Sequence, residues 1–164
     1  LRFSIDGREG WVDDGHFNMP GGEVFYCPVE DSTEGLVSFS EFPAVHEPDV
    51  VEGVRMRYEN GRVVEASASS NEDGLLRALD RDEGARVLGE FGIGCNPGIQ
   101  RHMKNTLFDE KMYGTIHLAV GAGIPVAGGT NQSATHWDMV KDLRSEGRIE
   151  LDGEVVQEHG AWTF

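Results

Sequence analysis

A histidine and an aspartate lie two residues apart near the C-terminal end of the chain, on either side of a tryptophan. The segment reads THWDMV, with His136, Trp137 and Asp138 in succession. Side chains at positions i and i+2 share a face in a β-strand, whereas in a helix they lie about 200° apart. In a strand, His136 and Asp138 would form a compact nitrogen–oxygen ligand pair with Trp137 packed behind them. We therefore predict a strand here, although the periodicity of residues 131 to 143 alone also allows a helix.

A third candidate ligand, His117, lies in the segment GTIHLAVG. Its large apolar residues alternate with small or polar ones, which predicts a strand that turns its apolar side to the core and carries His117 on the other face. Zinc, cobalt, manganese and iron(II) accept imidazole and carboxylate ligands, so His117, His136 and Asp138 make a set of two histidines and one carboxylate. The same pattern is also explained without a metal, if His117 is simply hydrogen-bonded inside the fold and His136 and Asp138 are exposed. Spacing alone does not decide between them.

Three glutamates stand in segments that could also carry chemistry. Glu23 follows the tight turn of NMPGGEVF, Glu90 is expected at the end of a helix just before FGIGCNPG, and Glu110 lies in LFDEKMYG, ahead of the His117 strand. In a chain with 29 acidic residues, each of them taken singly is most simply a solvated surface charge.

The elements that must position these residues are mostly strands. Asn60-Gly61 separates VRMRYE from RVVEAS, and Asp152-Gly153 separates RIEL from EVVQ. Both dipeptides favour tight hairpin turns between alternating segments. Asp6-Gly7, between LRFSI and REGWV, is a weaker third hairpin candidate. The 22 glycines fall mostly in turn-like clusters, which suits short strands joined by tight loops.

One helix is predicted, around residues 72 to 89. Asn71 can cap it, Glu72 and Asp73 fall in its first turn, and leucines follow at helical spacing. The expected fold class is α+β: a single β-rich domain with a largely antiparallel sheet and few helices. The candidate ligands are expected on strand faces and in the adjoining loops.

The charge balance limits the partners. The 29 acidic and 14 basic residues give a net charge of −15, and lysine occurs only at positions 104, 111 and 141. The negative electrostatic field of such a chain repels phosphates, so we expect no nucleic acid and no anionic membrane as a partner. The acidity is spread along the chain, which favours the solvated surface of a salt-adapted protein over a disordered tail. Two distant cysteines without a CxxC motif fit a reduced, cytoplasmic setting.

Five segments together resemble a known family. They follow one another in the order of the C-terminal catalytic half of the thermophilic metallo-aminopeptidases, the aminopeptidase T and aminopeptidase S group: NMPGGEVFYCPVEDS, LGEFGIGCNPG, FDEKMYGTIHLAVG, GGTNQSATHWDMVKDL and DGEVVQEHG. The resemblance covers residues 1 to 160. It implies that residues 1–164 are the C-terminal metal-binding catalytic domain of a longer chain whose N-terminal α/β domain is absent here. It also implies a homodimer when the protein is full length.

The resemblance implies a centre of two divalent ions, zinc, cobalt or manganese, that releases the N-terminal residue of a peptide through an activated water. Its implied metal ligands are Glu23, Glu90, Glu110, His117, His136 and Asp138. Glu90 would also be catalytic, carrying a proton from the water to the leaving amine.

One position departs from the family. Members place a tyrosine seven residues after the strand histidine, where it is thought to steady the tetrahedral intermediate, and this chain has Ile124 there. An aliphatic side chain cannot replace a hydroxyl. Tyr113, just before the His117 strand, is the candidate catalytic substitute.

Two other functions remain open at the level of sequence. A non-haem iron(II) dioxygenase that cleaves hydroxypyridine rings resembles the same fold and could use His117, His136 and Asp138 alone. The three retained glutamates favour the peptidase, because one iron with open positions for oxygen has no need of them. Because Ile124 replaces the family tyrosine, the chain could also be a non-catalytic homologue that only binds metal.

Overall fold

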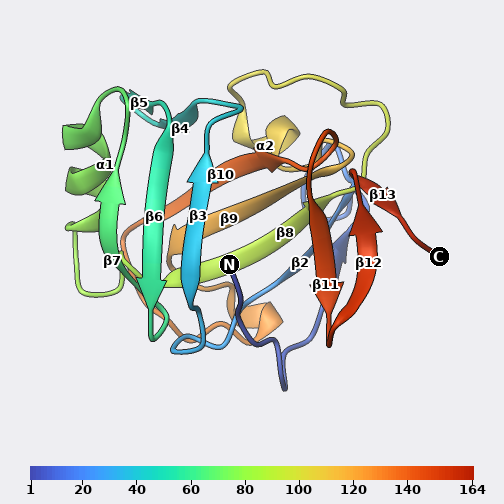
Figure 1. Cartoon of the computed structure of the whole chain (residues 1–164), viewed down its shortest axis with the longest axis horizontal. Helices are drawn as coiled ribbons and strands as arrows, with labels where there is room; N and C mark the ends of the chain where they lie inside the picture. Colours follow the sequence, from blue (N-terminus) through green and yellow to red (C-terminus); the bar gives the residue numbers. More distant parts are fainter.

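The computed structural model describes all 164 residues, and its central element is a five-stranded antiparallel sheet. The order across the sheet is β1-β2-β8-β9-β10. The strands are β1 (Trp11–Asp13), β2 (Glu23–Tyr26), β8 (Leu88–Gly94), β9 (Thr115–Gly121) and β10 (His136–Asp142). Figure 1 shows β8, β9 and β10 running side by side through the middle of the molecule.

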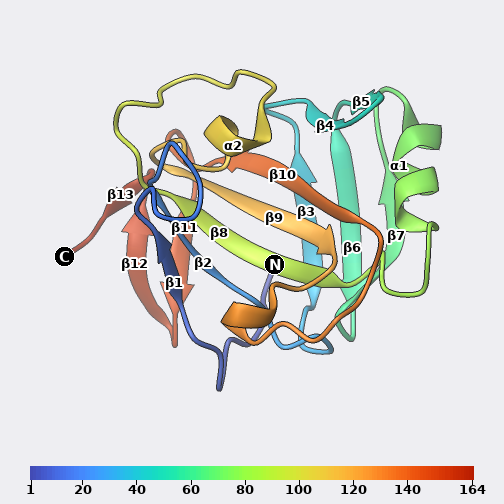
Figure 2. The same cartoon turned by 180° about the vertical axis from the view of Figure 1, so that it is seen from behind.

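A second sheet crosses one face of the first. It contains β3 (Gly35–Phe39), β6 (Val54–Glu59) and β7 (Arg62–Ser67) in the order β3-β6-β7. Figures 1 and 2 show its strands running steeply across β8 to β10. The main hydrophobic core of 18 buried residues lies between the two sheets, and β10 contributes Trp137 and Met139 to it. The other face of the central sheet is therefore free to carry polar side chains.

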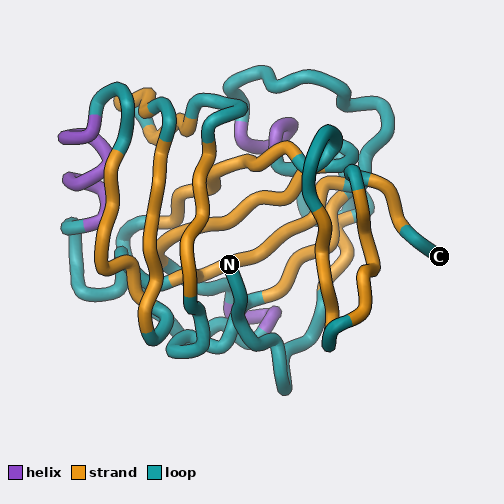
Figure 3. Tube along the Cα trace, in the orientation of Figure 1, coloured by secondary structure: helices purple, strands orange, loops and turns teal.

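Smaller elements surround the two sheets. They are the hairpin of β4 (Ala44–His46) and β5 (Asp49–Val51), helix α1 (Glu72–Leu79), helix α2 (Thr106–Asp109), a 3-10 turn (Pro125–Ala127), and a sheet of β11 (Arg148–Leu151), β12 (Glu154–Glu158) and β13 (Ala161–Trp162). Figure 3 shows the helical segments at the margins of the strands. No helix is long and apolar enough to cross a membrane. The predicted fold class, α+β with a largely antiparallel sheet and few helices, is confirmed.

Two of the three predicted hairpins form. The turns lie at Asn60-Gly61, between β6 and β7, and at Asp152-Gly153, between β11 and β12. All four of these residues have positive φ, as the tight turn requires. The third prediction was wrong. Asp6-Gly7 forms a turn, but residues 1 to 5 form no strand, because this segment bridges to Glu34 and β1 pairs with β2 instead.

The predicted helix begins as expected but ends ten residues early. Asn71 caps α1 by accepting the backbone N–H of Gly74, and the helix ends at Leu79. The backbone of the following segment pairs elsewhere: the N–H of Val63 donates to the Arg86 carbonyl, and the N–H of Gly121 donates to the Val87 carbonyl. The chain then enters β8 at Leu88. The expectation that Glu90 ends a helix was therefore wrong, because Glu90 lies inside a central strand.

Candidate metal centre

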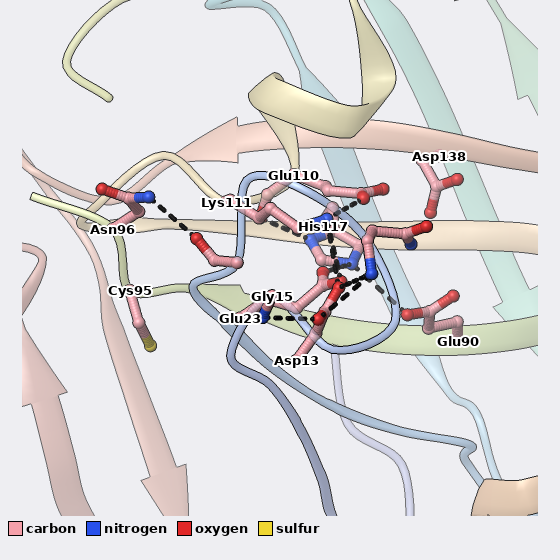
Figure 4. Close-up of polar contacts among 12 residues, drawn as sticks. Asp13, Gly15, Glu23, Glu90, Cys95, Asn96, Glu110, Lys111, His117 and Asp138 are labelled. Atoms are coloured by element: carbon pink, nitrogen blue, oxygen red, sulfur yellow. Dashed lines mark hydrogen bonds and ion pairs between the residues drawn. The ribbon is translucent and has the colours of Figure 1, made fainter. Parts of the chain in front are cut away.

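All six of the predicted ligand residues come together on the face of the central sheet opposite the main core. Glu23 is on β2, Glu90 on β8, His117 on β9, and His136 and Asp138 on β10, while Glu110 immediately follows α2. The predicted strand at residues 136 to 142 is confirmed. His136 and Asp138 share a face, and Trp137 packs behind them in the core with 2% of its surface exposed. Figure 4 labels five of the six residues, Glu23, Glu90, Glu110, His117 and Asp138, and shows them near one another.

Glu90 is the central carboxylate of the cluster. Its Oε1 lies 3.4 Å from Nε2 of His117, and its Oε2 lies 3.1 Å from Nε2 of His136. Each imidazole also meets a second carboxylate: His117 Nε2 is 3.3 Å from Oε2 of Glu23, and His136 Nε2 is 3.6 Å from Oδ2 of Asp138. Carboxylates and imidazoles thus alternate along the series of contacts Glu23–His117–Glu90–His136–Asp138.

Backbone carbonyls orient both imidazoles. Nδ1–H of His117 donates to the carbonyl of Glu110 at 3.1 Å, and Nδ1–H of His136 donates to the carbonyl of Ala122 at 2.9 Å. A carbonyl oxygen can only accept, so in the neutral rings the proton is on Nδ1 and the lone pair is on Nε2. Both Nε2 atoms face the carboxylates. This is how proteins commonly hold a histidine that binds a metal.

A glycine makes room for His117. Gly92 on β8 is its cross-strand partner, and a Cβ atom at position 92 would lie 2.0 Å from Cε1 and Nε2 of the imidazole. Real Cβ atoms do not come that close to other heavy atoms. The imidazole therefore lies directly over the β8 backbone, which only glycine permits.

Two buried carboxylate oxygens of the cluster, Oε2 of Glu23 and Oδ1 of Asp138, have no hydrogen-bond partner. A buried unpaired acceptor costs free energy, and few are found in native proteins. The donor atoms of Glu23, Glu110 and His117 lie within 4.8 Å of one another, as do those of Glu90, His117 and Asp138. Oxygen and imidazole donors in this number suit zinc, cobalt or manganese, so the residues fit the divalent ions that the family implies.

Burial and mutual charge shift the pKa values in the cluster. Burial alone would raise the pKa of Glu90, but the hydrogen bonds from His117 and His136 outweigh it and lower this pKa to about 2. Burial alone would lower the pKa of each imidazole, but the hydrogen bond to Glu90 and the nearby carboxylates raise it to about 9 for His117 and about 10 for His136. Burial also raises the carboxyl pKa of Glu23 and Asp138. The carboxylates thus favour the protonated, positively charged form of both imidazoles.

Sequence reasoning missed Lys111 and Asp13. Lys111 is completely buried, and its ammonium contacts Oε1 of Glu110, Oε1 of Glu23 at 3.2 Å and Oδ2 of Asp13 at 3.7 Å. Asp13 is on β1 and is 1% exposed. One signal for Lys111 was present in the sequence: it is one of only three lysines and directly follows Glu110. Nothing local distinguishes Asp13 among the many acidic residues.

Neither Tyr113 nor Ile124 joins the cluster through a hydrogen bond. Tyr113 is half-buried between α2 and β9. Ile124 packs against Phe25, Cys27 and Ala127, and its backbone N–H donates to Sγ of Cys27 at 3.2 Å. An apolar contact thus fills the position of the family tyrosine.

A cleft of about 420 Å³ adjoins the cluster. His136 and Asp138 form part of its wall, together with residues 45 to 47 of the β4 segment and residues 104 to 107 at the start of α2. A cleft of this size can admit a small organic molecule or the end of a peptide.

One protein-family model matches nearly the whole chain. The family described as thermophilic metalloprotease (M29) matches residues 5–162. Aminopeptidase AmpS from Bacillus subtilis is 34% identical over 170 aligned positions, which cover 90% of this chain and 40% of AmpS. The chain thus spans about two-fifths of the length of this relative.

Two solved structures share the fold. Wild-type AmpT from Thermus thermophilus superposes with a TM-score of 0.72 and 31% identity over 90% of this chain and 41% of AmpT. A 2,5-dihydroxypyridine dioxygenase from Pseudomonas putida KT2440 superposes with a TM-score of 0.78 and 18% identity over 95% of this chain and 49% of the dioxygenase. At that identity, the second likeness shows the fold alone.

Proposed function

The chain belongs to the thermophilic metalloprotease (M29) family, and from this membership we propose that it is the C-terminal metal-binding catalytic domain of a metallo-aminopeptidase. The reaction is release of the N-terminal residue from a peptide by a water activated at two divalent ions. The observation that carries the proposal is the cluster in which the buried Glu90 lies between His117 and His136. A cytoplasmic, homodimeric full-length protein with a preceding α/β domain belongs to the same proposal.

The donors divide into two groups. His117 lies within reach of both groups, but its single Nε2 can serve only one ion. We assign it to the first ion with Glu23 and Glu110. His136, whose Nε2 is 3.1 Å from Glu90 and 3.6 Å from Asp138, then completes the second group. When bound, the two ions supply the Lewis acidity that polarises the scissile carbonyl and makes a water acidic.

The residues of the chain supply the proton transfer and the space for the substrate. The Glu90 carboxylate lies between His117 and His136, where it can accept a proton from the water and then donate it to the leaving amine. The cleft beside His136 and Asp138 gives the peptide access to this point. Tyr113 stays the proposed substitute for the family tyrosine, since the Ile124 side chain offers no hydroxyl.

The test is metal content by mass spectrometry on protein purified without chelator or His tag. We expect nearly two zinc, cobalt or manganese ions per chain in the wild type and fewer than two in His136→Ala. His159→Ala is the matched control, because the ring of His159 binds the backbone of Ser145 in the C-terminal sheet region instead of the cluster. Hydrolysis of aminoacyl amides by the full-length protein completes the test.

The alternatives give different results. A single iron would favour the ring-cleaving dioxygenase, whose fold the chain shares. The buried carboxylates of Glu23 and Glu110 argue against it, because one iron with two histidines and one carboxylate leaves the single ammonium of Lys111 to offset both of them. Bound metal without turnover of any aminoacyl amide by the full-length protein would instead favour the non-catalytic homologue.

A further inference from the structure

Lys111 is the only lysine that is completely buried, and it lies among carboxylates of the candidate centre. The other two lysines, Lys104 and Lys141, are exposed or half-exposed. Burying an ammonium group is costly unless it is paired and hydrogen-bonded. The chain has only three lysines, and one of them is buried beside the candidate metal ligands. We therefore infer that Lys111 has a specific function there.

The ammonium of Lys111 engages only one oxygen of each ligand carboxylate. It contacts Oε1 of Glu110 and Oε1 of Glu23. Oε2 of Glu23 has no hydrogen-bond partner and instead lies 3.3 Å from Nε2 of His117. Because a carboxylate is planar, holding one oxygen fixes the direction of the other. Lys111 therefore turns the free oxygen of Glu23 toward the imidazole with which it would share an ion (Figure 4).

Asp13 supplies the counter-charge. Asp13 and Glu23 are directly opposite each other on β1 and β2, where two like charges repel. The ammonium of Lys111 contacts both, at 3.7 Å from Oδ2 of Asp13 and 3.2 Å from Oε1 of Glu23. The backbone N–H groups of Gly15 and Asn18 donate to Asp13 and hold it in place.

With two divalent ions bound, the formal charges of this region would balance. Two divalent ions offset the four ligand carboxylates, and Asp13 offsets Lys111. A lysine with its own counter-ion does not need to take the place of a metal ion. This distinguishes a lysine that positions ligands from one that competes with the metal for them.

We propose that Lys111, held by Asp13, is a positioning residue that orients Glu23 and Glu110 for the first of the two ions. The inference rests on the proposed function, because it presumes a divalent ion at these carboxylates. It concerns only that ion. The group of Glu90, His136 and Asp138 receives no contact from Lys111 and is expected to bind independently of it.

The test is calorimetric titration of the metal-free protein with Zn²⁺, and separately with Mn²⁺. In Lys111→Met, we expect one of the two ions to bind roughly 10- to 100-fold more weakly, the usual loss for a residue that orients a metal ligand. The second ion is expected to keep its affinity. Lys141→Met, the same substitution on a lysine whose ammonium contacts Glu41 and the Ser38 carbonyl instead of the cluster, is expected to change neither. Unchanged or tighter binding in Lys111→Met would overturn the proposal, since tighter binding is the mark of a lysine that competes with the ion.

A double variant separates orientation from charge. Asp13→Asn combined with Lys111→Met removes one negative and one positive charge, so the net charge stays the same. We expect the weak binding to persist, and a return to wild-type affinity would contradict an orienting role for Lys111. The double variant leaves no unpaired carboxylate at position 13, so it decides the question even if Lys111→Met does not fold.

A third comparison identifies the affected ion. In a Glu23→Gln background, Lys111→Met is expected to cause a smaller loss than in the wild type, because one of the two carboxylates that Lys111 orients is already changed. Independent, additive losses would contradict the assignment to Glu23. The number of ions bound by the wild type tests the proposed function, whereas the ratio of variant to wild-type affinity tests the role of Lys111. The two can therefore fail separately, except that a wild type that binds no ion overturns both.

Discussion

Replacing Gly92 with alanine should damage the candidate metal centre from the opposite strand. The added Cβ would lie 2.0 Å from Cε1 and Nε2 of His117, against an ordinary contact of 3.4–4 Å. The imidazole would have to move by more than an ångström. That movement would also break the hydrogen bond from Nδ1 of His117 to the Glu110 carbonyl.

The cost can be estimated in two parts. Overpacking a well-filled interior costs about 1–3 kcal/mol, and loss of one hydrogen bond adds about 1 kcal/mol. The metal-free Gly92→Ala protein should thus be about 2–4 kcal/mol less stable to urea than the wild type. Metal enlarges this gap. A ligand at 100 times its Kd stabilises a protein by about 2.7 kcal/mol, and a variant that binds it 100-fold more weakly keeps only about 0.4 kcal/mol.

The assay is urea unfolding with and without Zn²⁺, at a concentration of 100 times the wild-type Kd. We expect the difference between wild type and Gly92→Ala to grow by about 2 kcal/mol when zinc is added, the difference between those two stabilisations. Gly98→Ala is the control, since the nearest atom to its added Cβ is an exposed side-chain oxygen of Asn96 at 3.1 Å. A difference that is the same with and without zinc would refute His117 as a ligand. No difference at all would refute the placement of the imidazole over Gly92.

Three further results are expected. Gly61→Ala should lower the free energy of unfolding in urea by about 1–2 kcal/mol more than Gly153→Ala does. Both turns need positive φ, but only at position 61 would the added Cβ clash with backbone, 1.7 Å from the Glu30 carbonyl oxygen. Equal losses would contradict the packing of the first turn. Glu90→Gln in the full-length protein should lower kcat for an aminoacyl amide by at least roughly 100-fold, as loss of a general base does, while a variant that retains most of its turnover would remove Glu90 from the proton transfer. Tyr113→Phe should leave zinc content unchanged and lower kcat of the full-length protein by about 10-fold or more, if the hydroxyl steadies charge in the transition state; an unchanged kcat would make Tyr113 a packing residue.

Local features of the sequence were sufficient for several elements. The dipeptides Asn60-Gly61 and Asp152-Gly153 determine their turns because few residue pairs adopt positive φ easily at both positions. The alternation around His117 predicts a central strand because one face of it is buried in the core, whereas the strand at Trp137 was predicted from the spacing of His136 and Asp138. These preferences act within a few residues of chain, so the sequence alone expresses them. The ordered family segments likewise pointed to the six residues that the structure brings together.

Other features depended on contacts between distant parts of the chain. The helix ends at Leu79 because the backbone of residues 86 to 88 pairs with the β6–β7 hairpin and the end of β9, which places Glu90 within the sheet. The pairing of Asp13 with Lys111 arises only when β1 and the segment after α2 meet beside β2. No local preference distinguishes one carboxylate from another in an acidic chain. The sequence determined several of the strands and pointed to the six candidate ligands, whereas the tertiary structure decided which charges are buried together, because that depends on which strands become neighbours.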